Sequence, residues 1–369
     1  MRITAQNRLL LGPGPSTVHP EVLKAMSTPL VGHLDPYFLQ VMNQLQNQLR
    51  QVFQTENQLT IAMSGTGSAG METVMVNLLE PGDKIIIGIC GVFGERMKDV
   101  AERCGAEVIP VYEEWGRAID PEQIEKTLSS HPGVKAVAVV HAETSTGVWQ
   151  PLEDIARIAH SHGALFIVDA VTSLGGIPVE VDKLQIDACY SGTQKCIGAP
   201  PGLAPVTMNK AAMDKVMHRK TKVQSWYLDL NMISNYWGAD RFYHHTAPIS
   251  MIFGLHEALR LILEEGLEVT FRRHAENGQF LHNELEAMGL ELFAAKGYRL
   301  PELTAVRLPE SVDEGKLRRQ LLDEYGIEVG GGLGPLKGKA WRIGLMGYSS
   351  TRSNVTLLIQ AMKDLLGRG

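Results

Sequence analysis

The chain has 369 residues, of which 44% are hydrophobic and 21% are charged, and its formal net charge at pH 7 is -6. The length suits two domains, and the composition is ordinary for a globular protein. The negative charge argues against non-specific nucleic-acid binding, and no stretch approaches the roughly 18 apolar residues of a membrane span.

The N-terminus lacks the charged start and apolar run of a signal peptide. Four cysteines in so long a chain do not indicate a disulfide framework, and their spacing matches no zinc site. We therefore expect a cytoplasmic protein with no metal, in which these residues stay reduced: Cys90, Cys104, Cys189 and Cys196.

In chain order, residues 1–20 are expected to form a loop-like arm, because Gly12-Pro13-Gly14-Pro15 disfavours helix and strand. Asp120-Pro121 and Gln150-Pro151 each indicate the start of a helix. Between such signals, apolar runs predict strands at 59–63, 84–89, 107–112, 136–140, 164–168 and 203–208. Alternating strands and helices predict an α/β fold with a mostly parallel sheet, covered by helices, that binds ligands at the carboxyl ends of its strands.

After residue 250 the pattern becomes helical, over 252–263 and 269–288. It then alternates again, with strands expected at 303–308 and 341–345 and helices at 314–325 and from about residue 352. This pattern predicts a second, smaller α/β domain. We expect an arm of residues 1–20, a large domain of residues 21–265 and a small domain of residues 266–369.

The first loop that carries chemistry is Ser64-Gly65-Thr66-Gly67-Ser68-Ala69-Gly70, which lies between a predicted strand and a helix expected over 71–79. Its glycines let the backbone approach a phosphate, and the helix N-terminus supplies free N–H groups. Thr66 and Ser68 add hydroxyl groups suited to a phosphate monoester. The same glycines also fit the dinucleotide pattern, and a tight turn without a ligand is a further alternative.

The second loop begins at Asp169, directly after an apolar run. A carboxylate there needs a cationic partner or a place at the strand end, because burial of an unpaired charge is costly. A pyridinium nitrogen is one such partner, and an aspartate beside it strengthens the electron-withdrawing character of the ring. A strand-end aspartate or a helix cap remains the simpler interpretation of this motif alone.

The third loop holds Lys195, between a strand-like start at Tyr190 and a turn rich in glycine and proline. Lysine is the residue that forms Schiff bases, and desolvation makes its amine nucleophilic. A phosphate loop, then an aspartate, then a lysine is the chain order of pyridoxal-phosphate enzymes with a doubly wound sheet. A nicotinamide enzyme has no use for Asp169 and Lys195 in these settings.

With these motifs the chain resembles the class V aminotransferases, and within them the alanine–glyoxylate and serine–pyruvate type. The resemblance runs nearly end to end, through residues 10–16, 32–36, 64–70, 141–147, 168–169, 191–195, 243–246 and 341–344. It implies the fold type I architecture, with a mostly parallel seven-stranded sheet in the large domain, and it implies pyridoxal 5'-phosphate as the cofactor.

The resemblance also implies roles for individual residues. Lys195 would form the Schiff base and Asp169 would pair with the pyridine nitrogen. The remaining cofactor contacts would come from Thr66, Gly67, Ser68, Phe93, Thr144 and Gln194, and, across a homodimer interface, from Tyr243 and Thr246. Phe93 would stack on the ring. Arg342 would bind the substrate carboxylate, in a pocket to which Gly14 and His33 would contribute. His33, His244 and His245 remain open between this kind of role and packing of polar loops.

The implied reaction is a ping-pong transfer of the amino group of alanine or serine to glyoxylate or pyruvate, with Lys195 as the general base. A ureidoglycine–glyoxylate aminotransferase is the closest alternative, although His33 and the Tyr-His-His stretch stand where that type prefers amide side chains. A cysteine desulfurase is disfavoured, because no cysteine follows Cys196. A nicotinamide dehydrogenase and a catalytically silent scaffold are the alternatives from other classes.

Overall fold

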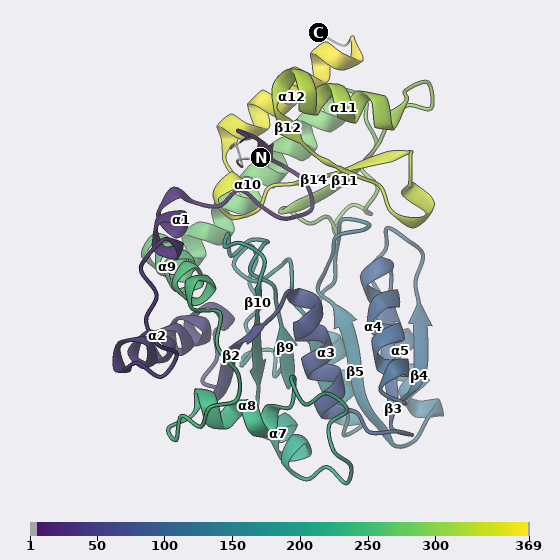
Figure 1. Ribbon diagram of the computed structural model, residues 1–369. Coiled ribbons are helices and arrows are strands. Elements are labelled where there is room, and N and C mark those ends of the chain that lie inside the picture. The colour runs from purple at the N-terminus through teal and green to yellow at the C-terminus, as the bar shows by residue number, and fades with distance from the viewer. Residues whose placement is uncertain (1–5, 368–369) are drawn as a thin grey trace.

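The computed structural model describes residues 6–367, which form a large sheet with helices around it and a smaller α/β layer above it (Figure 1). The large sheet has seven strands in the order β2-β10-β9-β8-β5-β3-β4. Their bounds are β2 Leu59–Ser64, β10 Leu203–Met208, β9 Ala188–Tyr190, β8 Leu165–Asp169, β5 Val134–Val140, β3 Lys84–Ile89 and β4 Glu107–Tyr112. Only β10 runs antiparallel to its neighbours, so the predicted mostly parallel sheet is confirmed.

The strands form where apolar, β-branched residues run together, because both faces of the sheet are covered. Helices α3, α4, α5 and α6 connect the parallel strands, whereas α1, α2 and α9 pack together beside the edge strand β2 (Figure 1). The helices of this part are α1 Pro20–Met26, α2 Pro36–Phe53, α3 Gly67–Leu78, α4 Val92–Arg103, α5 Pro121–Ser130, α6 Glu153–Ser161, α7 Lys210–Met217, α8 Leu230–Trp237 and α9 Ile249–Glu265.

The smaller layer is built on a sheet of order β11-β14-β13. Its elements are α10 Leu267–Ala287, β11 Leu303–Arg307, α11 Glu314–Tyr325, β12 Ile327–Glu328, β13 Gly330–Gly331, β14 Ala340–Gly344 and α12 Arg352–Leu366. Three short strands and two short 3-10 helices complete the fold: β1 Leu9–Leu10, β6 Ala142–Glu143, β7 Val148–Trp149, η1 Gly334–Leu336 and η2 Gly347–Ser349. Buried side chains of the smaller layer form a core separate from that of the large sheet, and Leu11 of the arm belongs to it.

The structure differs from the sequence-based expectation in several places, and three of them lie in or near the site. The helix expected from residue 71 begins at Gly67, so the glycine loop itself forms the first turn of α3. The arm is not entirely a loop, because β1 pairs in parallel with β12; its residues 1–5 lie outside the described residues. The strand β9 was not predicted as a strand. The prediction at Asp120 is confirmed, since its side chain caps α5.

Glu302 is a buried acid whose neighbours in the sequence belong to a third, small cluster of buried apolar residues. Its neighbours in the chain, Leu300 and Leu303, belong to this cluster, as does Cys196. Glu302 is fully buried, and neither of its carboxyl oxygens has a hydrogen-bond partner among the described residues. Burial raises the pKa of Glu302 from 4.5 to about 8, so the folded protein holds this side chain as the neutral acid at pH 7.

Replacement of Glu302 by leucine should therefore stabilise the fold at pH 7 by about 1–3 kcal/mol, the usual cost of an unsatisfied buried polar group. Because the unfolded chain loses this proton at lower pH than the folded one, wild-type stability falls as pH rises from about 4.5 to about 8. Glu302→Gln removes the titration but keeps a polar group, so it should flatten this part of the profile with less stabilisation. Thermal unfolding across this pH range measures both effects, and an unchanged pH slope in the glutamine variant contradicts the assignment.

No helix within residues 6–367 combines the length and the apolar character needed to cross a bilayer.

Candidate active site

A cavity of about 220 Å³ lies at the carboxyl ends of the parallel strands, where such sheets bind ligands. The loops after β2, β3, β5, β8 and β9 all contribute to its walls. Eight of the predicted site residues line it together: Thr66, Gly67, Ser68, Phe93, Thr144, Asp169, Gln194 and Lys195. The strand order brings these residues to one place, although they span 130 positions of the sequence.

One end of the cavity is the N-terminus of α3. Thr66 is the N-cap residue, yet its side chain makes no capping hydrogen bond, and both Thr66 and Ser68 are exposed. The first N–H groups of a helix have no partner within the helix, and the dipole favours an anion there. Gly67 must be glycine, because a Cβ atom would lie 2.9 Å from the side chain of Val171. This end of the cavity suits a phosphate group.

Asp169 is the last residue of β8 and is buried. Its Oδ1 accepts a hydrogen bond from the backbone N–H of Val171 at 2.8 Å, and its Oδ2 accepts one from the Tyr190 hydroxyl at 2.9 Å. Burial raises the pKa of Asp169 to about 6, while these two donors and the charges of Lys195 and Arg96 oppose the rise. A cationic group bound in the cavity would hold this carboxylate in its charged form.

Lys195 is also buried, five residues after β9. Burial lowers the pKa of its amine to about 8, and the nearby Arg342 guanidinium acts in the same direction. The arm holds the lysine in place: the amine donates to the Pro13 carbonyl, and the Ser16 hydroxyl donates to the Lys195 carbonyl at 2.8 Å. Gly14 is in contact as well, since a Cβ atom there would lie 2.8 Å from the lysine side chain. A lysine with a lowered pKa serves as both nucleophile and base near neutral pH.

Arg342 reaches the same region from β14 in the smaller sheet. Its Nε donates to the Gly331 carbonyl at 2.8 Å, and its Nη1 donates to the Thr144 carbonyl at 3.5 Å. Burial lowers the pKa of Arg342 to about 10, and the Glu143 carboxylate opposes this shift. Arg342 is not among the residues lining the cavity, but its contact with Thr144, which does line it, brings the guanidinium to the cavity wall.

The other predicted residues lie outside this cavity. His33 and Tyr243 contact each other, with ring centroids 5.0 Å apart, and the Tyr243 hydroxyl lies 3.4 Å from that of Thr246. Tyr243 and Thr246 are exposed. In the single chain these three residues therefore form a separate surface group, and any contact with a cofactor would have to come from a second copy of the protein.

A chain of hydrogen bonds runs from Trp226 through His244 and His245 to Ser64, at the start of the phosphate loop. His244 Nε2 lies 3.3 Å from the Trp226 carbonyl, the two histidine Nδ1 atoms are 2.8 Å apart, and His245 Nε2 lies 2.8 Å from the Ser64 hydroxyl. Because a carbonyl only accepts, neutral His244 carries its hydrogen on Nε2, so His245 donates from Nδ1 and accepts from Ser64. Burial lowers the pKa of His245, which favours this neutral arrangement.

Three residues around the cavity were not predicted from the sequence. Arg96 lines it, one helical turn after Phe93, with its guanidinium 4.8 Å from the Phe93 ring centroid. The Tyr190 hydroxyl donates a hydrogen bond to Asp169, and the Glu143 carboxylate accepts one from the backbone N–H of Phe93. Only the motif at residues 141–147 drew attention to Glu143, and nothing in the sequence separated it from its neighbours.

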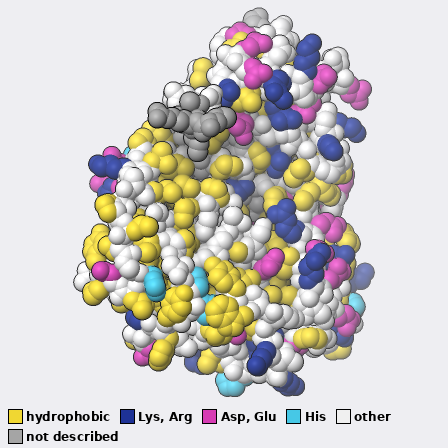
Figure 2. All heavy atoms as spheres, in the orientation of Figure 1, with side chains coloured by type: hydrophobic (Ala, Val, Ile, Leu, Met, Phe, Trp, Pro, Cys, Tyr) yellow, Lys and Arg dark blue, Asp and Glu magenta, His cyan; other side chains and the backbone are white. Residues whose placement is uncertain are grey.

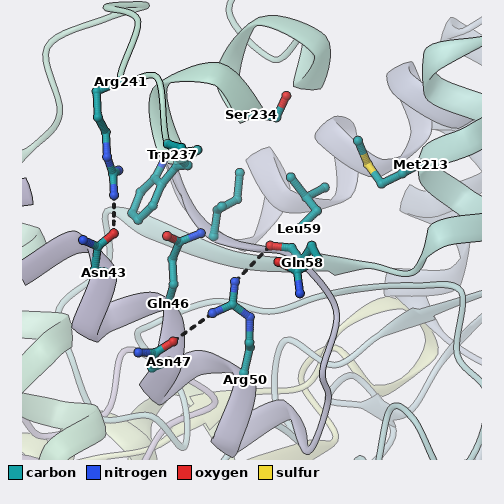
Figure 3. A pocket seen from close by; sticks show the side chains of 13 residues that line it. Asn43, Gln46, Asn47, Arg50, Gln58, Leu59, Met213, Ser234, Trp237 and Arg241 are labelled. Carbon is teal, nitrogen blue, oxygen red and sulfur yellow. Dashed lines mark hydrogen bonds between the residues drawn. The ribbon is translucent and has the colours of Figure 1, made fainter.

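A second hollow, of about 830 Å³, lies between α2, the start of β2 and α8 (Figure 3). Arg241 donates to Asn43, and Arg50 donates to Asn47 and to the Gln58 carbonyl, so both guanidinium groups are engaged by the protein (Figure 3). None of the predicted site residues lines this hollow. We therefore place the chemistry in the smaller cavity.

A phosphate cradle, a buried carboxylate and a buried lysine with a lowered pKa fit pyridoxal phosphate. Gln194, which lines the cavity, has an Oε1 atom that is buried without a hydrogen-bond partner among the described residues, so its acceptor capacity is unused. The fold and the cavity thus define an enzyme of the pyridoxal-phosphate-dependent type.

The comparisons with known proteins identify the family. The aminotransferase class-V family matches residues 9–357. An alanine–glyoxylate aminotransferase of Callithrix jacchus is 40% identical over 99% of this chain and 89% of its own. A (S)-ureidoglycine–glyoxylate transaminase of Bacillus subtilis (strain 168) is 41% identical over 98% of this chain and 91% of its own. The crystal structure of an alanine–glyoxylate aminotransferase from Nostoc sp. matches with a TM-score of 0.97 and 49% identity, over 99% and 97% of the two chains.

The chain therefore belongs to the class V aminotransferases, and pyridoxal phosphate is its cofactor. The family expected from the sequence motifs is confirmed, and the dehydrogenase and silent-scaffold alternatives are excluded.

Proposed function

We propose that this enzyme moves the amino group of a small L-amino acid, alanine or serine, to glyoxylate or pyruvate in a ping-pong reaction. The observation that carries the proposal is the placement of Lys195, with its lowered pKa, in one cavity with Asp169 and the N-terminus of α3. The names of the relatives from Callithrix jacchus and Nostoc sp. support alanine and glyoxylate as the pair.

When bound, pyridoxal phosphate supplies an aldehyde that condenses with amines and a ring that accepts electrons. Thr66, Gly67 and Ser68 would hold its phosphate, and Asp169 would hold the charge on its ring nitrogen. Phe93 would stack on the ring, while Thr144 and Gln194 would orient it. Lys195, once its amine is free, would carry the α-proton of the substrate as general base and acid. Arg342 would fix the substrate carboxylate near Gly14, and His33 of the partner subunit would approach from the other side of the interface.

We also propose a homodimer in which Tyr243 and Thr246 complete the cofactor site of the partner. Large hydrophobic side chains gather at the lower left of the face in Figure 2. The segments around α2 and α8 expose several large hydrophobic side chains: Leu30, Leu34, Tyr37, Trp226, Tyr227, Phe242 and Tyr243. The Tyr236 hydroxyl donates to the His33 carbonyl at 3.0 Å. This hydrogen bond joins the segment around His33 to helix α8. An exposed apolar area of this kind marks an interaction surface.

Two further parts of the proposal concern organisation. The division into an arm of residues 1–20 and domains of 21–265 and 266–369 is supported by the separate cores of the two layers. Cytoplasmic placement is supported by the four cysteines, which are all buried and unpaired.

A ureidoglycine–glyoxylate activity is the second candidate, because the Bacillus subtilis relative of that name is 41% identical. The visible absorption of the purified holoenzyme separates the two candidates. A cofactor band that fades with L-alanine and returns with glyoxylate would support the main proposal. A band that responds to (S)-ureidoglycine but not to alanine or serine would support the second candidate. Absence of any cofactor band after addition of pyridoxal phosphate would contradict both.

A further inference from the structure

Glu143 is a buried carboxylate that no proposed catalytic step uses. It belongs to the short strand β6, and its side chain is completely buried at the N-terminus of α4. Its Oε2 accepts hydrogen bonds from the backbone N–H groups of Phe93, at 3.1 Å, and Gly94, at 3.3 Å. Its Oε1 accepts from the backbone N–H of Ser145 at 3.0 Å and from the Ser145 hydroxyl at 2.5 Å.

Ser145 completes this arrangement. Its Oγ accepts a hydrogen bond from the backbone N–H of Val92 at 3.0 Å while donating to Glu143. Together the two side chains satisfy the first three N–H groups of α4, which a helix leaves without internal partners. The residue in the N-cap position, Gly91, has no side chain to do so. A distant segment of the chain therefore caps α4, and a negative charge at that end of a helix is stabilising.

Gly91 independently supports the capping of α4 by Glu143 and Ser145. Their side chains lie so close to the backbone at residue 91 that only glycine leaves room for them. A Cβ atom on Gly91 would lie 2.4 Å from the Ser145 Oγ and 2.5 Å from the Glu143 Cδ. No rearrangement of one flexible side-chain end would relieve both contacts. Gly91, Glu143 and Ser145 therefore depend on one another at this point of the structure.

We infer that Glu143 is a positioning residue for the cofactor site, which it serves by fixing Phe93. This inference rests on the proposed role of Phe93 as the ring that stacks on the cofactor. The side chain of Phe93 lines the cavity, while its backbone N–H is held by Glu143. Thr144, the next residue after Glu143, lines the same cavity. The carboxylate therefore ties the loop after β3 to the loop after β5 at the wall where the cofactor ring would lie.

Glu143→Gln is the variant that tests the inference. Glutamine has the same shape, but its NH₂ group would face either the N–H groups of Phe93 and Gly94 or the donors of Ser145. We expect the cofactor to bind about five- to tenfold more weakly, the order of one lost aromatic stacking contact, and its visible circular dichroism band to shrink. Ser145→Ala removes one donor and keeps the carboxylate, so it should give a smaller change and serves if the glutamine variant does not fold.

Asp187→Asn is the matched control. Asp187 is another buried carboxylate with three partners, His160, the backbone N–H of Phe166 and Asn209, and it lies away from the cofactor cavity. Asp187→Asn should lower the melting temperature but leave the cofactor affinity and the circular dichroism band of the cofactor unchanged. If Asp187→Asn changes the cofactor measurements as much as Glu143→Gln does, the effect is general destabilisation and the inference is wrong.

The combination with Phe93→Ala separates failure of the inference from failure of the proposed site. If Glu143 acts through Phe93, Glu143→Gln should weaken cofactor binding no further in a Phe93→Ala background. If the two effects multiply, Glu143 does not act through Phe93 and the inference is overturned. If Phe93→Ala alone leaves the affinity and the spectrum unchanged, the proposed stacking role of Phe93 fails, and the inference fails with it.

Discussion

Replacement of Lys195 by alanine is expected to lower kcat by about 10⁴-fold or more while leaving the fold intact. A positioned general base alone contributes about 10²–10⁴-fold, and this side chain also supplies the amine that holds the cofactor. Because its pKa is lowered to about 8, a substantial fraction of the amine is neutral near physiological pH. Cofactor affinity should fall less than turnover, since Thr66, Ser68 and Asp169 remain in the cavity.

The experiment compares single-turnover rates and cofactor binding of the Lys195→Ala holoprotein with those of wild type. Lys183→Ala is the control, because Lys183 forms a surface ion pair with Glu180 at 2.9 Å and should not affect either measurement. Added methylamine should restore part of the proton transfer in Lys195→Ala, because it supplies a base of similar chemistry. Normal turnover of Lys195→Ala without added amine would remove this residue from the proposed chemistry.

Much of the large sheet could be predicted because its inner strands, such as β3, are buried on both faces, and because the edge strand β4 still carries an apolar run although only Val111 in it is buried. The runs at 84–89 and 107–112 are rich in isoleucine and valine, and β3 and β4 have these bounds in the structure. In contrast, β9 has only three residues, Ala188–Tyr190, which is too short for a periodic signal. Its place between β8 and β10 depends on pairing with segments distant in sequence.

The start of α3 shows a second limit of sequence reasoning. Glycine-rich segments usually interrupt helices, so the loop at 64–70 was expected to precede the helix. In the structure Gly67 and Gly70 are helical, because α3 packs closely against the sheet. A Cβ atom on Gly70 would lie 3.1 Å from that of Ala204 and 3.2 Å from that of Tyr190. The close packing, which the sequence does not reveal, outweighs the low helix propensity of glycine.

The candidate site was predictable where a chemically distinctive residue follows a strand. Asp169, Lys195 and Thr66 meet this condition, and all three line one cavity. Glu143 was not singled out, because its importance depends on contacts with the backbone at residues 93 and 94. Arg342 is intermediate: only the family resemblance assigned it a role, and the structure buries it in β14, beside Gly331 and Thr144.

Replacement of Arg342 by alanine should lower kcat/KM for every carboxylate substrate by about 10- to 100-fold. A hydrogen bond to a charged group contributes about 1.5–3 kcal/mol, and the guanidinium can offer two to a carboxylate. The Gly331 and Thr144 carbonyls hold two of its five N–H groups and leave the others for a ligand. Both half-reactions should suffer, since the amino acid and the keto acid each carry a carboxylate.

Arg342→Lys should fall between wild type and Arg342→Ala, because lysine keeps the charge but cannot bind in the bidentate manner. Arg307→Ala is the control on the neighbouring strand, where Arg307 pairs with Glu291 at 3.3 Å. Alaninamide, which lacks the carboxylate, distinguishes a binding role from a structural one: Arg342→Ala should reduce activity toward alanine but not the low activity toward the amide. Equal losses for both donors would mean that Arg342 supports the loop at Thr144 and does not bind substrate. That outcome would leave the substrate carboxylate without an assigned partner, and Arg96, which lines the cavity, would be the next residue to test.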